Sequence, residues 1–137
     1  MKSPMQRARR LLALQQQLHR IERWRLLDLE HKSAELDRER RELIAALNQD
    51  DALQGLFLDA TARRLLSLAQ QADEIAREEA AQQARVAEQA VLVACSERLA
   101  ETEEETARHA SERKALEDVI ERAVGAATQA SRKIAER

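Results

Sequence analysis

Between Pro4 and Gly125 the chain contains no proline, and Gly55 is the only glycine. The rest of this span is rich in Ala, Leu, Glu, Arg and Gln, all of which are good helix formers. Only the stretch 48–61 gathers residues that favour turns. We therefore expect an all-α fold of two very long helices joined by one turn. Such a structure offers no deep pocket, so its function depends on surfaces and protein partners.

Local signals set the expected ends of the helices. Ser3 and Pro4 form a good start, since serine is a preferred N-cap and proline suits the first helical position. The first helix should run from about 4 to about 48, roughly 65 Å. The turn should lie within about 48–60: either Asp50 or Asp51 caps a new helix, or an irregular tip continues to about 60. The second helix should cover about 60–135, about 110 Å.

The composition indicates a coiled coil within a single domain of 137 residues. Charged residues make up 35% of the chain, and Trp24 and Phe57 are the only aromatic residues. Disorder is a poor alternative, because the leucines are periodic and glycine and proline are nearly absent. No apolar run approaches the roughly 20 residues of a membrane span, and the basic start lacks the apolar run of a signal peptide. We expect a cytoplasmic protein without direct membrane insertion.

Apolar residues spaced three and four apart predict the faces that pack. On the first helix the stripe shifts by one residue near Trp24. It consists of Leu11, Leu14, Leu18 and Ile21, then Leu26, Leu29, Ser33, Leu36, Arg40, Leu43 and Leu47. The first stripe on the second helix consists of Leu65, Leu68 or Ala69, Ala72, Ile75 or Ala76, Ala80, Gln83, Val86 or Ala87, and Ala90. The second consists of Leu92, Cys95, Leu99, Thr102, Thr106, His109, Arg113, Leu116, Ile120, Ala123, Ala127, Ala130 and Ile134.

These stripes and the charges favour one antiparallel pairing. Folding the second helix back near residue 53 places Leu14 opposite Leu92 and Leu43 opposite Leu65. The same register brings the basic N-terminus beside an acidic stretch of the second helix. The basic residues are Arg7, Arg9 and Arg10, and the acidic ones are Glu97, Glu101 and Glu103 to Glu105. Residues from about 103 to 137 then have no partner in the chain, and their apolar stripe is expected to bind a second copy or another protein.

No set of residues predicts catalysis, a metal or a cofactor. His19, His31 and His109 have no second histidine or cysteine one helical turn away, and we expect them to be solvated or to line the helix contact. Cys95, the only cysteine, is expected to be a small apolar packing residue. The basic N-terminus lacks interleaved aromatic residues and any nucleic-acid-binding motif, so we expect it to pair with the acidic stretch.

Two apolar sites are candidates for partner binding. Trp24 either packs half-buried over the shift in the stripe or anchors an interface. The run 56–58, which includes Phe57, either closes the tip of the hairpin or presents an exposed binding surface, since three adjacent large apolar residues cannot all face one helix.

The chain resembles the FliJ family of flagellar export proteins and their YscO-type counterparts in virulence secretion. The resemblance rests on the opening RARRLLALQQQLHRIERWRLLDLE, the central ELDRERRELIAALN and the Ala/Gln/Glu-rich return helix. It implies a non-catalytic coiled-coil stalk that enters the pore of the export ATPase hexamer and connects it to the export gate, with a further role toward export chaperones. It also implies a location at the cytoplasmic side of the inner-membrane export apparatus.

The resemblance assigns the two ends of the hairpin to different partners. The ATPase end would carry Arg7, Arg9, Arg10, Leu116, Ile120 and Ile134, and the gate end would carry Leu43, Leu47, Phe57 and Leu65. Two alternatives stay open. One is a self-associating structural coiled coil, a homodimer in which 103–137 pairs with the same segment of a second chain. The other is a holdase-like chaperone that grips clients through its tip.

Overall fold

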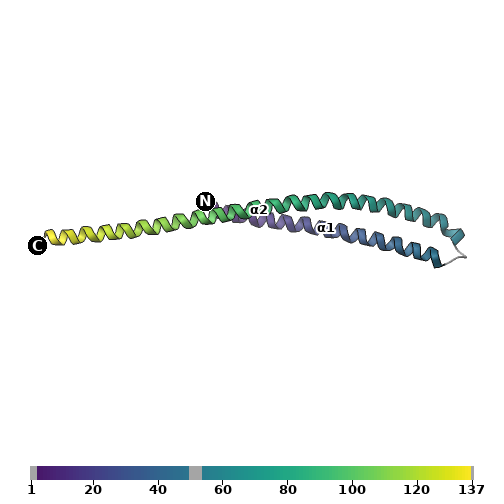
Figure 1. Ribbon diagram of the computed structural model, residues 1–137, viewed down its shortest axis with the longest axis horizontal. Helices are drawn as coiled ribbons and strands as arrows, with labels where there is room; N and C mark the ends of the chain where they lie inside the picture. Colours follow the sequence, from purple (N-terminus) through teal and green to yellow (C-terminus); the bar gives the residue numbers. More distant parts are fainter. Residues whose placement is uncertain (1–2, 50–53, 137) are drawn as a thin grey trace. The chain divides into compact units, whose positions relative to one another are not determined.

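The computed structural model describes residues 3–49 and 54–136, and side chains are described for all of these except 54–57. Two helices account for the described chain: α1, Pro4–Gln49, and the longer α2, Gln54–Ala135 (Figure 1). The described residues contain no β-strand. The predicted all-α hairpin with a longer C-terminal helix is confirmed.

The start of α1 is a capping box, in which the N-cap residue and the third helical residue satisfy each other's backbone N–H groups. The Gln6 backbone N–H donates to Ser3 Oγ at 3.2 Å, and the Ser3 backbone N–H donates to Gln6 Oε1 at 3.2 Å. The N-cap predicted at Ser3 is therefore confirmed, with Gln6 as its reciprocal partner.

The segment between the two helices is shorter than the range of about 48–60 within which the turn was predicted. α1 ends at Gln49 and α2 begins at Gln54, so the second helix starts earlier than the predicted position near 60. Asp50 and Asp51, the predicted capping residues, lie outside the described residues.

Contacts within the chain define two units. The hairpin unit comprises Leu14–Ala94, and the terminal unit comprises Met1–Ala13 with Cys95–Arg137.

In the hairpin unit, α1 and α2 lie side by side and bury a thin apolar layer (Figure 1). Leu68 is the one fully buried large side chain among the described residues, at 1% exposure. Partly buried residues at three- and four-residue spacing surround it on both helices. These residues are Leu26, Leu29, Ser33, Leu36, Leu43 and Leu47 on α1, and Leu65 and Ile75 on α2. These predicted packing residues are confirmed. Arg40 and Ala72, predicted in the same stripes, are exposed, and Glu39 and Gln71, one residue earlier in the chain, are partly buried instead.

The predicted shift of the α1 stripe near Trp24 is wrong. The heptad of Leu26 and Leu29 continues without interruption toward the N-terminus and brings Gln15, His19 and Glu22 against α2. The predicted packing residues of this part of α1 are exposed instead: Leu14, Leu18 and Ile21. A change of stripe by one residue would require α1 to turn by about 100° about its axis. The leucine-rich part of the hairpin fixes the rotation of the helix and prevents this change.

On α2, too, the buried residues lie one position away from the predicted ones. In the hairpin unit Val86, Gln89 and Val93 are partly buried and Gln82 is buried, whereas the predicted Ala80, Gln83, Ala90 and Leu92 are exposed. Leu14 and Leu92, expected to face each other, are both exposed. The observed pairs are Gln15 with Gln89 and Glu22 with Gln82.

In the terminal unit the fully buried residues are small, and the larger Met5 and Leu12 of α1 are only partly buried. Ala8 of α1 and Ser96 and Ala100 of α2 are buried. Four residues that the sequence placed in the contact are exposed: Leu11, Cys95, Leu99 and Thr102. Small side chains allow two helix backbones to approach closely, so this contact buries little apolar area.

Candidate partner-binding surfaces

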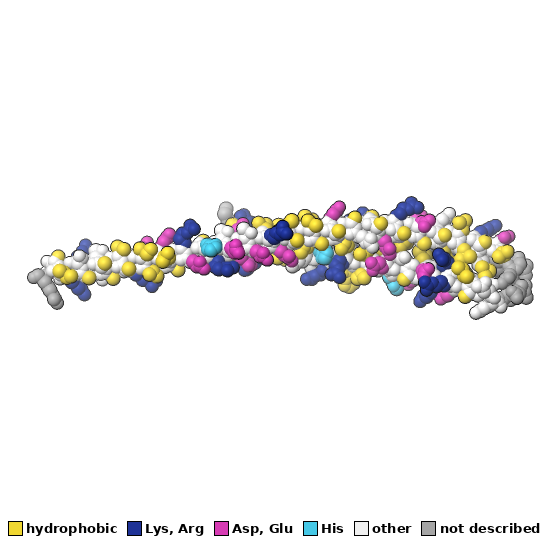
Figure 2. Space-filling view, viewed as in Figure 1, with side chains coloured by type: hydrophobic (Ala, Val, Ile, Leu, Met, Phe, Trp, Pro, Cys, Tyr) yellow, Lys and Arg dark blue, Asp and Glu magenta, His cyan; other side chains and the backbone are white. Residues whose placement is uncertain are grey.

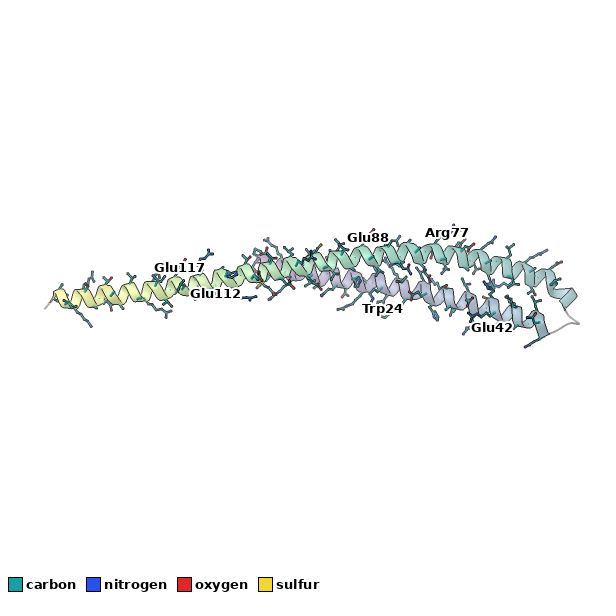
Figure 3. The ribbon with its side chains drawn as sticks, in the orientation of Figure 1. Trp24, Glu42, Arg77, Glu88, Glu112 and Glu117 are labelled. Atoms are coloured by element: carbon teal, nitrogen blue, oxygen red, sulfur yellow. The ribbon has the colours of Figure 1, made fainter. Side chains whose placement is uncertain are left out.

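The first candidate surface lies on α1 in the hairpin unit, on the side away from α2. Leu14, Leu18, Ile21 and Trp24 form this surface, which we call the outer α1 face. Their spacing of four, three and three residues keeps them on one side of the helix. Trp24 is 75% exposed and Leu14 is 55% exposed. Figure 3 shows Trp24 pointing away from α2. The half-buried position predicted as one alternative for Trp24 is therefore wrong.

A shallow hollow lies at the Trp24 end of the outer α1 face. Its lining residues are Gln17, Arg20, Ile21, Trp24, Arg25 and Asp28. Arg25 pairs with Glu22 at 3.1 Å, and Asp28 pairs with Lys32 at 3.1 Å. Within the described part of the chain Arg20 makes no ion pair, which leaves its guanidinium available beside exposed apolar carbons.

Because Leu14, Leu18 and Ile21 point to solvent, polar side chains form this part of the contact between α1 and α2. Gln82, 3% exposed, donates through Nε2 to the Glu22 carbonyl oxygen at 2.9 Å and also to the Glu22 carboxylate. Gln89 Nε2 donates to the Gln15 carbonyl oxygen at 3.2 Å and to the Gln15 side-chain oxygen. These bonds satisfy the buried amides, and no buried side-chain polar atom among the described residues lacks a partner.

The second candidate surface is the part of α2 that follows the paired region of the terminal unit. Glu104 is the last described residue that is not exposed, and all residues 105–136 are exposed. We call residues 105–136 the terminal α2 segment. Large apolar side chains remain on it at helical spacing: Leu116, Val119, Ile120, Val124 and Ile134. Figure 2 shows hydrophobic side chains along this segment. The boundary predicted near residue 103 is confirmed.

Charges on the terminal α2 segment are unevenly distributed. The charged residues between Lys114 and Arg122 are all acidic: Glu117, Asp118 and Glu121. Glu112 and Glu117 lie on the part of α2 that has no other helix beside it (Figure 3). A partner for this stretch should therefore combine apolar and basic side chains.

The basic N-terminus pairs with α2 in the terminal unit, as the sequence predicted. Arg9 Nη2 lies 3.0 Å from Glu104 Oε1, and Arg9 Nε donates to the same oxygen at 3.0 Å. Arg7 lines a hollow with Leu11, Leu99 and Glu103. Arg10 is exposed.

Of the other predicted partner-binding residues, Leu116, Ile120 and Ile134 lie on the terminal α2 segment, and Ile134 is 76% exposed. The side chain of Phe57 lies outside the described residues. Sequence reasoning missed Leu14, Leu18 and Ile21 as exposed surface. Their 3-4 spacing is the usual sign of a packed face, and only the uninterrupted heptad from Leu26 onward could have indicated otherwise.

Among the described residues, no group of three His, Cys, Asp or Glu side chains is placed to hold a metal ion. The described helices contain no stretch apolar enough, over a sufficient length, to cross a bilayer. Comparison of the chain with protein-family models, curated proteins and solved structures found no match.

Proposed function

We propose that this chain is a non-catalytic coiled-coil stalk or adaptor of a flagellar or type III protein export apparatus, of the FliJ type. The observation that supports the proposal most is the terminal α2 segment, which carries an exposed apolar stripe beyond the paired helices. A single helix continuing from a paired coiled coil is a narrow element that suits insertion into the pore of a ring-shaped ATPase. The proposed location is the cytoplasm, at the inner-membrane export apparatus.

In this proposal the end that carries both termini contacts the export ATPase. The apolar Leu116, Ile120 and Ile134 would pack against the walls of the pore, and the cations of Arg7 and Arg10 would add electrostatic attraction. Arg9 would contribute mainly to the pairing of α1 with α2, because its guanidinium is already bound to Glu104. The opposite end of the hairpin, with Leu43, Leu47, Phe57 and Leu65, would approach the export gate or export chaperones.

The test is co-purification of the chain with the export ATPase of the same genome, followed by ATP turnover with and without the chain. We expect stable binding and raised turnover. A variant lacking 105–137 should lose both effects and keep its paired helices. The matched control is Leu66→Glu, which places a charge at an exposed position of α2 in the hairpin unit. Absence of binding by a correctly folded full chain would refute the proposal.

A self-associating structural coiled coil is the second candidate, and the same exposed stripe favours it. In its simplest form two copies pair through their terminal α2 segments, with Ile120 and Ile134 at the contact. This function predicts a stable dimer in the absence of any ATPase. Sedimentation of the purified chain at several concentrations measures this directly, and a monomer at all concentrations would exclude it.

A further inference from the structure

Each of the two candidate surfaces carries an exposed apolar stripe, and the charges beside the two stripes have opposite signs. We infer that a second copy of this chain covers the outer α1 face with its terminal α2 segment. The contact is heterotypic: it joins Leu14, Leu18, Ile21 and Trp24 of one copy to the Leu116 and Ile120 region of the other. It does not depend on the proposed export function.

The apolar residues of both surfaces recur at helical spacing, three or four residues apart. Leu14, Leu18 and Ile21 follow one another at four and three residues. Leu116, Ile120 and Val124 follow at four and four, with Val119 beside Ile120. Each surface is therefore one narrow stripe a few turns long, and two such stripes can interdigitate in the manner of a coiled coil. All of these side chains are exposed in the single chain, so a contact between them removes apolar area from water on both sides.

The charges beside the two stripes have opposite signs. Within 14–25 the acid Glu22 faces α2 and is bound by Gln82 and Arg25. The exposed basic residues beside this face are then Arg20 and Arg25, which line the hollow at Trp24. The acid of that hollow, Asp28, is already paired with Lys32. On α2, Glu117 and Glu121 lie beside the apolar stripe, one residue after Leu116 and one residue after Ile120. Opposite charges flanking an apolar stripe select the partner of a helix.

Charge also disfavours the homotypic contact. Pairing two terminal α2 segments side by side in parallel through their apolar stripes places Glu117 and Glu121 of one copy near the same residues of the other. Like charges at flanking positions of a coiled coil weaken it. The outer α1 face offers arginines instead, and Arg20 is without an ion-pair partner in the described part of the chain.

The test uses the full chain and two charge-introducing variants, Leu18→Glu on the outer α1 face and Ile120→Glu on the terminal α2 segment. Both positions are exposed, so each variant should keep the helicity of the natural chain by circular dichroism. Sedimentation equilibrium should show self-association of the natural chain. Each variant alone should associate at least about tenfold more weakly, because a buried carboxylate is unfavourable in an apolar contact. Leu66→Glu, at an exposed site away from both surfaces, should behave as the natural chain.

Mixing the two variants decides between the heterotypic and the homotypic contact. The Leu18→Glu chain keeps an intact terminal α2 segment, and the Ile120→Glu chain keeps an intact outer α1 face. Their equimolar mixture should regain association that neither variant shows alone. If Leu18→Glu associates as tightly as the natural chain, if the mixture stays dissociated, or if the natural chain is monomeric at every concentration, the inference is overturned. Because no ATPase is present, these results are independent of the test of the export function.

Discussion

At the scale of single residues, buried polar side chains set the character of the helix contact. Gln82 and Ser96 are two of the five buried described residues, together with Ala8, Leu68 and Ala100. Each glutamine bond across the helices removes an amide from water and returns a hydrogen bond, so its net contribution to stability is small. The loss of one partner, however, leaves the other partner without its hydrogen bond in a partly buried site.

The pair of Gln82 and Glu22 allows this asymmetry to be measured. Gln82→Ala should lower the free energy of unfolding by about 1–3 kcal/mol, because Glu22 loses a donor and a small cavity forms. The double variant Gln82→Leu with Glu22→Leu should be at least as stable as the natural chain, because it replaces both polar partners with apolar ones. Urea unfolding followed by circular dichroism gives both values. A double variant less stable than Gln82→Ala would contradict the explanation.

The capping box at the start of α1 gives a second prediction at this scale. Ser3→Ala should weaken the first turn by about 1 kcal/mol, because the Gln6 backbone N–H loses its acceptor. Faster amide hydrogen exchange should be confined to the first turn of α1. Ser3→Asp serves as the control, since aspartate is an equally good N-cap and should preserve slow exchange.

At the scale of the helices, continuity of the heptad decides which face is buried. The leucine-rich contact around Leu68 fixes the orientation of each helix about its own axis. Because the helix is rigid, the same orientation applies to the neighbouring turns, whose side chains are less apolar. Gln15, His19 and Glu22 are therefore turned inward, and Leu14, Leu18 and Ile21 are turned outward. The helices themselves were predictable from the sequence, because helix formation depends on residues close in the chain.

Gly125 provides a test of the terminal α2 segment as an element. It is helical, and a Cβ atom added there would meet no atom within 4 Å outside the immediate helix backbone. Gly125→Ala should therefore stabilise the local helix by about 1 kcal/mol. Hydrogen exchange should slow around position 125 and stay unchanged in the paired helices. An unchanged hydrogen-exchange rate around position 125 would contradict the explanation, because it would mean that helix propensity does not limit the local stability there.

At the scale of the whole chain, residues 105–136 bury none of their described side chains. Removal of 105–137 should therefore leave the cooperative unfolding of the paired helices nearly unchanged, with a midpoint close to that of the full chain. Glu104 is retained in this variant, so its ion pair with Arg9 persists. Thermal unfolding at a low concentration, where self-association is absent, is the measurement. A large fall in the midpoint would show that the segment supports the hairpin.

Four features were predictable from the sequence: the two helices, the N-cap at Ser3, the antiparallel pairing and the point near Glu104 where the pairing ends. These features depend on local preferences, on the scarcity of Gly and Pro, and on counting residues back from the turn. Which of two adjacent stripes is buried depends on the packing of one helix against the other. Both stripes satisfy helical spacing and differ by a single residue, so the choice is made by the side chains of the opposite helix. As a result, Gln82 is buried, and Leu18 and Cys95 are exposed.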